Sequence, residues 1–139
     1  MNNIVLATDG STYSDAAARY LTDNPLLKRD FTVHVVHCEP KVTGDVRSFV
    51  SNDDIAAWHH DESKRSMQSV TDILREGDVA VECHELVGFA PERIVEYADA
   101  VKAVAIVMGS HHRAPFLNAI IGSVSGRVLA HAHCPVLLI

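Results

Sequence analysis

The sequence predicts an α/β fold, in which five parallel strands form one sheet with helices on both of its faces. Two observations predict this class. Short apolar runs alternate along the whole chain with segments of helical periodicity, as in strands joined by crossover helices. The apolar runs are also nearly continuous, which suits parallel strands that are buried on both faces. We find no linker or low-complexity run, so we expect a single domain over residues 1–139.

The first third of the chain predicts a strand, a helix and a second strand. The run NIVLATD at 3–9 is almost entirely apolar and predicts the first strand. A helix follows over 11–23, where Ser11 or Ser14 can cap its start and Pro25 ends it. Its expected inward stripe contains Ala17, Tyr20 and Leu21. Residues 31–38 form the second strand, because apolar and polar residues alternate there.

A polar connection then leads into a long helix that ends at Gly77. Its second half is the clearer one, since Met67, Val70 and Leu74 recur at helical spacing. Its first half, AAWHHDESKR, is amphipathic, and we expect Trp58 in the core or at a contact between subunits.

The remaining elements alternate in the same way. VAVECHELV at 79–87 is the third strand, and 90–102 is a helix with Pro91 in its first turn. AVAIVMGS at 103–110 is the fourth strand. Residues 123–132 form the last helix, and PVLLI at 135–139 is the last strand.

Composition excludes several classes of protein. The net charge of −6 argues against general nucleic-acid binding, which needs a basic face. The longest apolar stretches are far too short to span a membrane, and the start of the chain does not resemble a secretory signal. Cys38, Cys83 and Cys134 lie far apart, so we expect free thiols and a cytoplasmic location.

The best candidate site lies in the loops that follow the first and fourth strands, ATDGS and GSHH…GS. Ligands bind at the carboxyl edge of such sheets, where the strand order reverses. Gly109 allows the backbone to leave the sheet in an unusual conformation, and Gly122 precedes a helix whose first turn can bind phosphate. The alternative is structural: Gly122 makes a turn and Ser123 caps the helix. Asp9 is open to two interpretations as well, a ligand for ribose or Mg²⁺, or an Asx turn with Gly10.

Taken together, VLATDGS, LVGFAPERIVEYA, IVMGSHH, the glycine–serine helix start and CPVLLI resemble the universal stress protein family over the whole chain. The resemblance implies a Rossmann-like fold of the adenine nucleotide alpha hydrolase type, a homodimer that pairs through residues 135–139, and ATP or AMP as ligand, with or without Mg²⁺. It places adenine and ribose near Ala7, Thr8, Asp9 and Cys38, and ribose near Met108, Gly109 and His111. The implied phosphate cradle is Gly122, Ser123, Val124 and Ser125.

One position departs from the family's nucleotide-binding pattern, Gly-x2-Gly-x9-Gly-[Ser/Thr]. Gly109, Gly122 and Ser123 match it, but His112 stands at the second glycine. A β-carbon there costs about 1 kcal/mol in a left-handed conformation. A protonated His112 and the neighbouring Arg113 could in turn pair with phosphate. We expect weakened or altered nucleotide binding.

Three hypotheses for function follow. The first is a stress-response protein that binds an adenine nucleotide as a regulatory ligand and so controls an unknown protein partner. The second is a dimeric interaction module of the same fold that binds no nucleotide. The third is a slow ATPase that uses Asp9 and Mg²⁺. No nucleophile–base pair is visible, so we expect no designed enzyme activity. We also expect no resident metal, because neither HHDE nor HAHC supplies three converging ligands.

Overall fold

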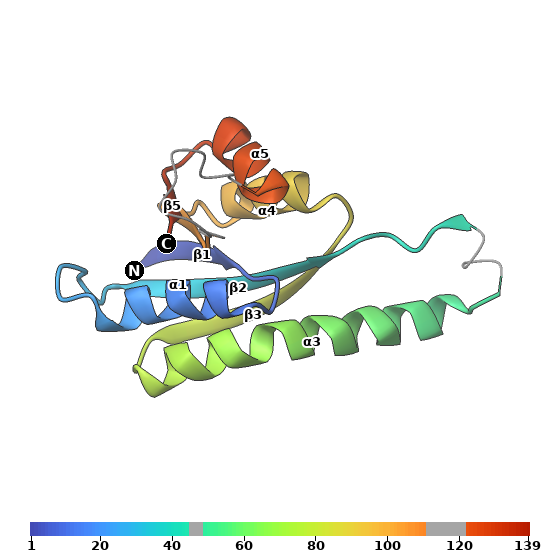
Figure 1. Cartoon of the computed structure of the whole chain (residues 1–139), viewed down its shortest axis with the longest axis horizontal. Coiled ribbons are helices and arrows are strands. Elements are labelled where there is room, and N and C mark those ends of the chain that lie inside the picture. Colours follow the sequence, from blue (N-terminus) through green and yellow to red (C-terminus); the bar gives the residue numbers. More distant parts are fainter. Residues whose placement is uncertain (45–48, 111–121) are drawn as a thin grey trace.

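The computed structural model describes residues 1–44, 49–110 and 122–139 (Figure 1). Its centre is a five-stranded parallel sheet of order β3-β2-β1-β4-β5. The strands are β1 (Asn2–Ala7), β2 (Phe31–Glu39), β3 (Ala80–Val87), β4 (Ala105–Met108) and β5 (Val136–Leu138). The predicted α/β class and its five parallel strands are therefore confirmed.

Within the described ranges, two helices cover each face of the sheet. Helices α1 (Thr12–Asp23) and α3 (Asn52–Glu76) lie on one face, and α4 (Ala90–Ala100) and α5 (Ser123–His131) lie on the other (Figure 1). The less certain first half of the long helix is helical, because α3 runs without a break for 25 residues from a Ser51 cap. No helix within the described ranges is both long enough and apolar enough to cross a membrane.

The sheet has one hydrophobic core on each face, and successive apolar residues of β1 and β2 contribute to them. Leu6, Val33 and Val35 are fully buried towards α1 and α3. Val5 and Val36 are buried towards α4 and α5. Because successive side chains of a strand point to opposite faces, a strand buried on both sides such as β1 is nearly continuously apolar.

Tyr20 of α1 differs from the sequence analysis, whereas the N-cap is one of the two serines expected. Tyr20 is 37% exposed, whereas Ala17 and Leu21 are buried as expected, so Tyr20 lies at the edge of the stripe. Ser11 occupies the N-cap position, and Ser14 lies inside the helix.

Trp58 of α3 is also only partly covered, with 47% of its surface exposed, and it does not belong to the core.

Candidate functional site

A cavity of about 290 Å³ opens at the carboxyl edge of the sheet. β1 is the central strand. The chain adds β2 and β3 on one side of it and then returns to add β4 and β5 on the other side. Such a reversal separates the loops that follow the strands and leaves a crevice between them. The lining residues are Ala7, Thr8, Asp9, Ser14, Val36, His37, Cys38, Ala90, Ile94, Met108, Gly109, Gly122, Ser123, Val124 and Ser125.

The cavity has an apolar floor and a polar rim. Ala7, Val36 and Met108 are buried residues at the ends of three strands, and Ile94 faces them from α4. The rim consists of hydroxyl and carboxylate side chains from the TDGS loop, from α1 and from the start of α5. A planar heteroaromatic group with a polar, anionic tail matches this division.

The TDGS loop is organised by Asp9. The Asp9 carboxylate accepts hydrogen bonds from the Ser11 amide at 2.9 Å and from the Ser14 hydroxyl at 3.1 Å. Gly10 has a φ of +82°, which L side chains rarely adopt. The Asx turn is therefore present, and the same residues line the cavity, so the two interpretations of Asp9 are compatible.

Gly109 is needed for a different reason from the expected one. Its φ is not among the positive values of the described residues, so an unusual backbone conformation does not explain it. A β-carbon at Gly109 would lie 2.3 Å from the carbonyl carbon and oxygen of Tyr13 and 2.7 Å from the Ser14 amide nitrogen. The end of β4 thus packs directly against the backbone of α1, where only glycine fits.

Gly122 and the start of α5 form the open end of the cavity. A β-carbon at Gly122 would meet no atom of the described residues within 4 Å. Gly122 is the N-cap of α5, so the amides of the following first turn point out of the helix start. Together with the partial positive charge of the helix start, this geometry suits an anion.

His37 is a wall residue that the sequence analysis missed. Its Nδ1 lies 2.8 Å from the Thr8 carbonyl oxygen, and its Nε2 lies 2.5 Å from the Glu39 carboxylate. The contact ties β2 to the end of β1 and thereby fixes the floor of the cavity. The polar His37 within an otherwise apolar strand was the available signal in the sequence. Only the sheet order shows that this residue lies beside Thr8.

Cys38 lines the same wall as a protonated thiol. Its sulfur lies 3.6 Å from the Gly88 carbonyl oxygen. Burial raises the pKa of the Cys38 thiol, and the nearby Arg93 only partly opposes that rise. Cys38 is therefore a weakly polar contact surface and a poor nucleophile.

The structure brings ten of the twelve predicted site residues to this one cavity. The ten are Ala7, Thr8, Asp9, Cys38, Met108, Gly109, Gly122, Ser123, Val124 and Ser125. His111 and His112 lie outside the described residues. That the ten contact a nucleotide stays a prediction. Ser14, Val36, His37, Ala90 and Ile94 were not foreseen, because they come from segments whose sequence shows only helix or strand periodicity.

Comparison with known proteins agrees with this geometry. The model of the universal stress protein family matches residues 1–139. A universal stress protein of Methanocaldococcus jannaschii is 31% identical over 142 residues, which cover 98% of this chain and 80% of that protein. The solved universal stress protein of Archaeoglobus fulgidus is 32% identical with a TM-score of 0.77, covering 100% of this chain and 98% of that one. A second structure from the same organism, in complex with dAMP, is 30% identical with a TM-score of 0.72 over the same shares of the two chains. This chain belongs to the universal stress protein family.

Proposed function

We propose that the protein binds an adenine nucleotide, AMP or ATP, in the cavity at the carboxyl edge of the sheet, as a regulatory ligand and not as a substrate. The observation that carries the proposal is that one cavity joins an apolar floor to a helix start that none of the described residues obstructs. The dAMP complex of the similar Archaeoglobus fulgidus protein supports it.

The apolar floor and the polar rim suggest a place for each part of the ligand. Adenine would lie on the floor between Val36 and Ile94, beside Cys38. Ribose would lie near Asp9, whose carboxylate is already held by two hydrogen bonds and so needs little reorganisation. The phosphates would reach the start of α5, where Ser123 and Ser125 line the rim.

The first experiment is mass spectrometry of small molecules released from freshly purified, denatured protein, followed by titration with AMP and with ATP·Mg²⁺. Recovered adenine nucleotide, or saturable binding in the micromolar range, is the expected result. A blank extract together with a flat titration would mean that the protein is a family member that does not use this cavity for nucleotides.

Cys38 offers a reporter of occupancy inside the cavity. We expect AMP to protect Cys38 from alkylation by iodoacetamide and to leave the exposed Cys83 unaffected, because Cys83 lies outside the cavity. In the free protein, alkylation of Cys38 should keep accelerating at pH values above those that saturate an ordinary thiol, since its pKa is raised. Peptide mapping by mass spectrometry measures both rates. Equal protection of the two thiols would indicate a global effect of AMP and would count against this site.

Hydrolysis is not expected to accompany binding. The Asp9 carboxylate, which could act as a base, is engaged in the TDGS turn, where it accepts hydrogen bonds from the Ser11 amide and the Ser14 hydroxyl. Incubation with ATP·Mg²⁺ should release no phosphate above a blank. Metal-dependent turnover that disappears in Asp9→Asn, a variant that keeps the turn, would instead establish the slow ATPase.

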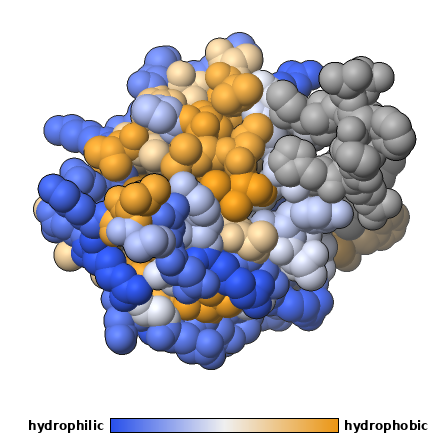
Figure 2. Space-filling view, turned by 60° about the vertical axis from the view of Figure 1, so that its left-hand side comes forward, coloured by the Kyte–Doolittle hydropathy of each residue, from blue (hydrophilic) through white to orange (hydrophobic). Residues whose placement is uncertain are grey.

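The sheet edge at β5 favours a homodimer as the form in which the ligand acts. β5 is the last strand of the sheet, and Leu137 within it is 37% exposed. Leu129 of α5 and Val104 before β4 are exposed by 47% and 46%. Viewed from the side of the chain termini, the molecule shows hydrophobic side chains gathered above a hydrophilic lower part (Figure 2). Sedimentation velocity, with and without AMP, tests the proposed dimer, and a monomer at all concentrations would rule it out.

A further inference from the structure

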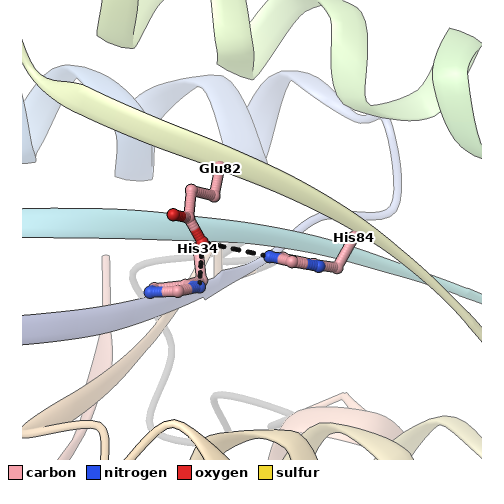
Figure 3. A group of neighbouring side chains, drawn as sticks. All are labelled: His34, Glu82 and His84. Carbon is pink, nitrogen blue, oxygen red and sulfur yellow. Dashed lines mark hydrogen bonds and ion pairs between the residues drawn. The ribbon is translucent and has the colours of Figure 1, made fainter.

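Three side chains of β2 and β3 converge outside the cavity. His34 of β2 pairs in register with Glu82 of β3, and His84 follows two residues later on the same face. Glu82 Oε2 lies 3.4 Å from His34 Nδ1 and 3.4 Å from His84 Nε2. All three ligand atoms lie within 4.8 Å of one another (Figure 3). None of the three residues lines the nucleotide cavity.

Both separations are long for hydrogen bonds, although His84 Nε2 and Glu82 Oε2 can still form a weak one, and they also suit two ligands of one cation. A charged hydrogen bond between an imidazole and a carboxylate is normally about 2.7–2.9 Å long. Two ligands of a tetrahedral zinc ion, each about 2.0–2.1 Å from the metal, lie roughly 3.3–3.5 Å apart. The two distances from Glu82, to His34 and to His84, are both 3.4 Å and fall in this ligand-to-ligand range.

Neighbouring groups fix which nitrogen of His34 is free to bind a cation. The Asn3 amide donates from Nδ2 to the Val101 carbonyl oxygen at 2.8 Å, which turns its Oδ1 towards His34. His34 Nε2 lies 3.3 Å from that oxygen and therefore carries the hydrogen. The lone pair is then on Nδ1, the nitrogen that faces Glu82. Such a second hydrogen bond is the usual support of a metal-binding histidine.

Tyr97 supplies the hydrogen bond that Nδ1 accepts without a metal. Its hydroxyl lies 3.0 Å from His34 Nδ1. Tyr97 and a cation thus compete for one lone pair.

We propose that His34, Glu82 and His84 bind a divalent transition metal ion of the zinc class, with a fourth position left for water. Two imidazoles and one carboxylate are the ligand types that zinc accepts, whereas calcium and magnesium prefer oxygen alone. The site is reachable, because the Glu82 and His84 side chains are 57% and 38% exposed. The bound ion would cross-link the edge strand β3 to β2.

Zn²⁺ titration in competition with a chromophoric chelator tests the proposal, in the full chain without an affinity tag. The wild type is expected to bind one equivalent, and His84→Ala and Glu82→Gln are each expected to weaken that binding at least tenfold. Both residues are partly exposed, so the variants should fold, which circular dichroism checks.

His60→Ala is the matched control. His60 lies 3.1 Å from Glu85 in an exposed histidine–glutamate pair that involves the same strand, and no third ligand joins this pair among the described residues. It should bind Zn²⁺ as the wild type does. Tyr97→Phe should bind at least as tightly, because it removes the competing hydroxyl. Wild-type binding that is absent, or that is unchanged in His84→Ala, would overturn the proposal.

Replacement of Zn²⁺ by Co²⁺ identifies the donor atoms. Nitrogen and oxygen ligands give visible absorption without the near-ultraviolet charge-transfer band of a cobalt–thiolate bond. A thiolate band that persists in His84→Ala would assign the metal to the free cysteines and so overturn the site.

Discussion

Replacing Gly109 by alanine is expected to lower the free energy of unfolding by about 3 kcal/mol, a value at the upper end of the usual cost of overpacking. The added methyl group would lie 2.3 Å from the carbonyl atoms of Tyr13. Those are backbone atoms of α1 and cannot move aside as the end of a flexible side chain would. The alternative to unfolding is a displacement of α1 from β4, which would also widen the nucleotide cavity.

Urea denaturation followed by circular dichroism measures this change. Gly122→Ala is the control, because its new methyl group meets no atom of the described residues and should alter stability by only about 0.5 kcal/mol. If Gly109→Ala proves as stable as the wild type, the end of β4 does not lie against the backbone of α1, and the position of Gly109 in the cavity wall is wrong.

Replacing Gly122 by valine is expected to weaken AMP binding at least about tenfold, which corresponds to 1.4 kcal/mol. The isopropyl group would fill the space in front of the first turn of α5, where we place the phosphates. The fold should change little, with a cost of about 1 kcal/mol because valine is a poor N-cap residue. Isothermal titration of AMP and adenosine separates the phosphate from the rest of the ligand.

Adenosine should bind Gly122→Val and the wild type with nearly equal affinity, since it has no phosphate. Gly122→Ala should show an intermediate loss for AMP. Wild-type affinity for AMP in Gly122→Val would place the phosphate elsewhere and would contradict the proposed cradle, whereas equal losses for AMP and adenosine would point to a general disturbance of the cavity.

The metal proposal and the nucleotide proposal are independent of each other. His34, Glu82 and His84 do not line the cavity, so Gly122→Val should leave Zn²⁺ binding unchanged. His84→Ala should in turn leave AMP binding unchanged. A cross effect in either direction would show that the two sites are coupled through β2, which contributes to both.

The sequence by itself determined the elements and the polar loops of this protein. Helical and strand periodicities are local properties, because they reflect which residues one element buries. The runs at β1 and β2 and the spacing of Met67, Val70 and Leu74 were therefore sufficient. Small and polar residues at strand ends also gave most of the cavity rim, since Asp9, Gly122 and Ser123 carry a local signal.

Only the tertiary structure decided which of these elements meet. The order β3-β2-β1-β4-β5 places His37 beside Thr8, although 29 residues separate them. The register of β2 against β3 sets His34 opposite Glu82, which makes a metal site from residues that no sequence window shows together. The role of Gly109 likewise depends on Tyr13, a residue of another element. Contacts between distant segments depend on how the elements pack and on the order of the strands. The periodicity of residues along the chain reports neither of these.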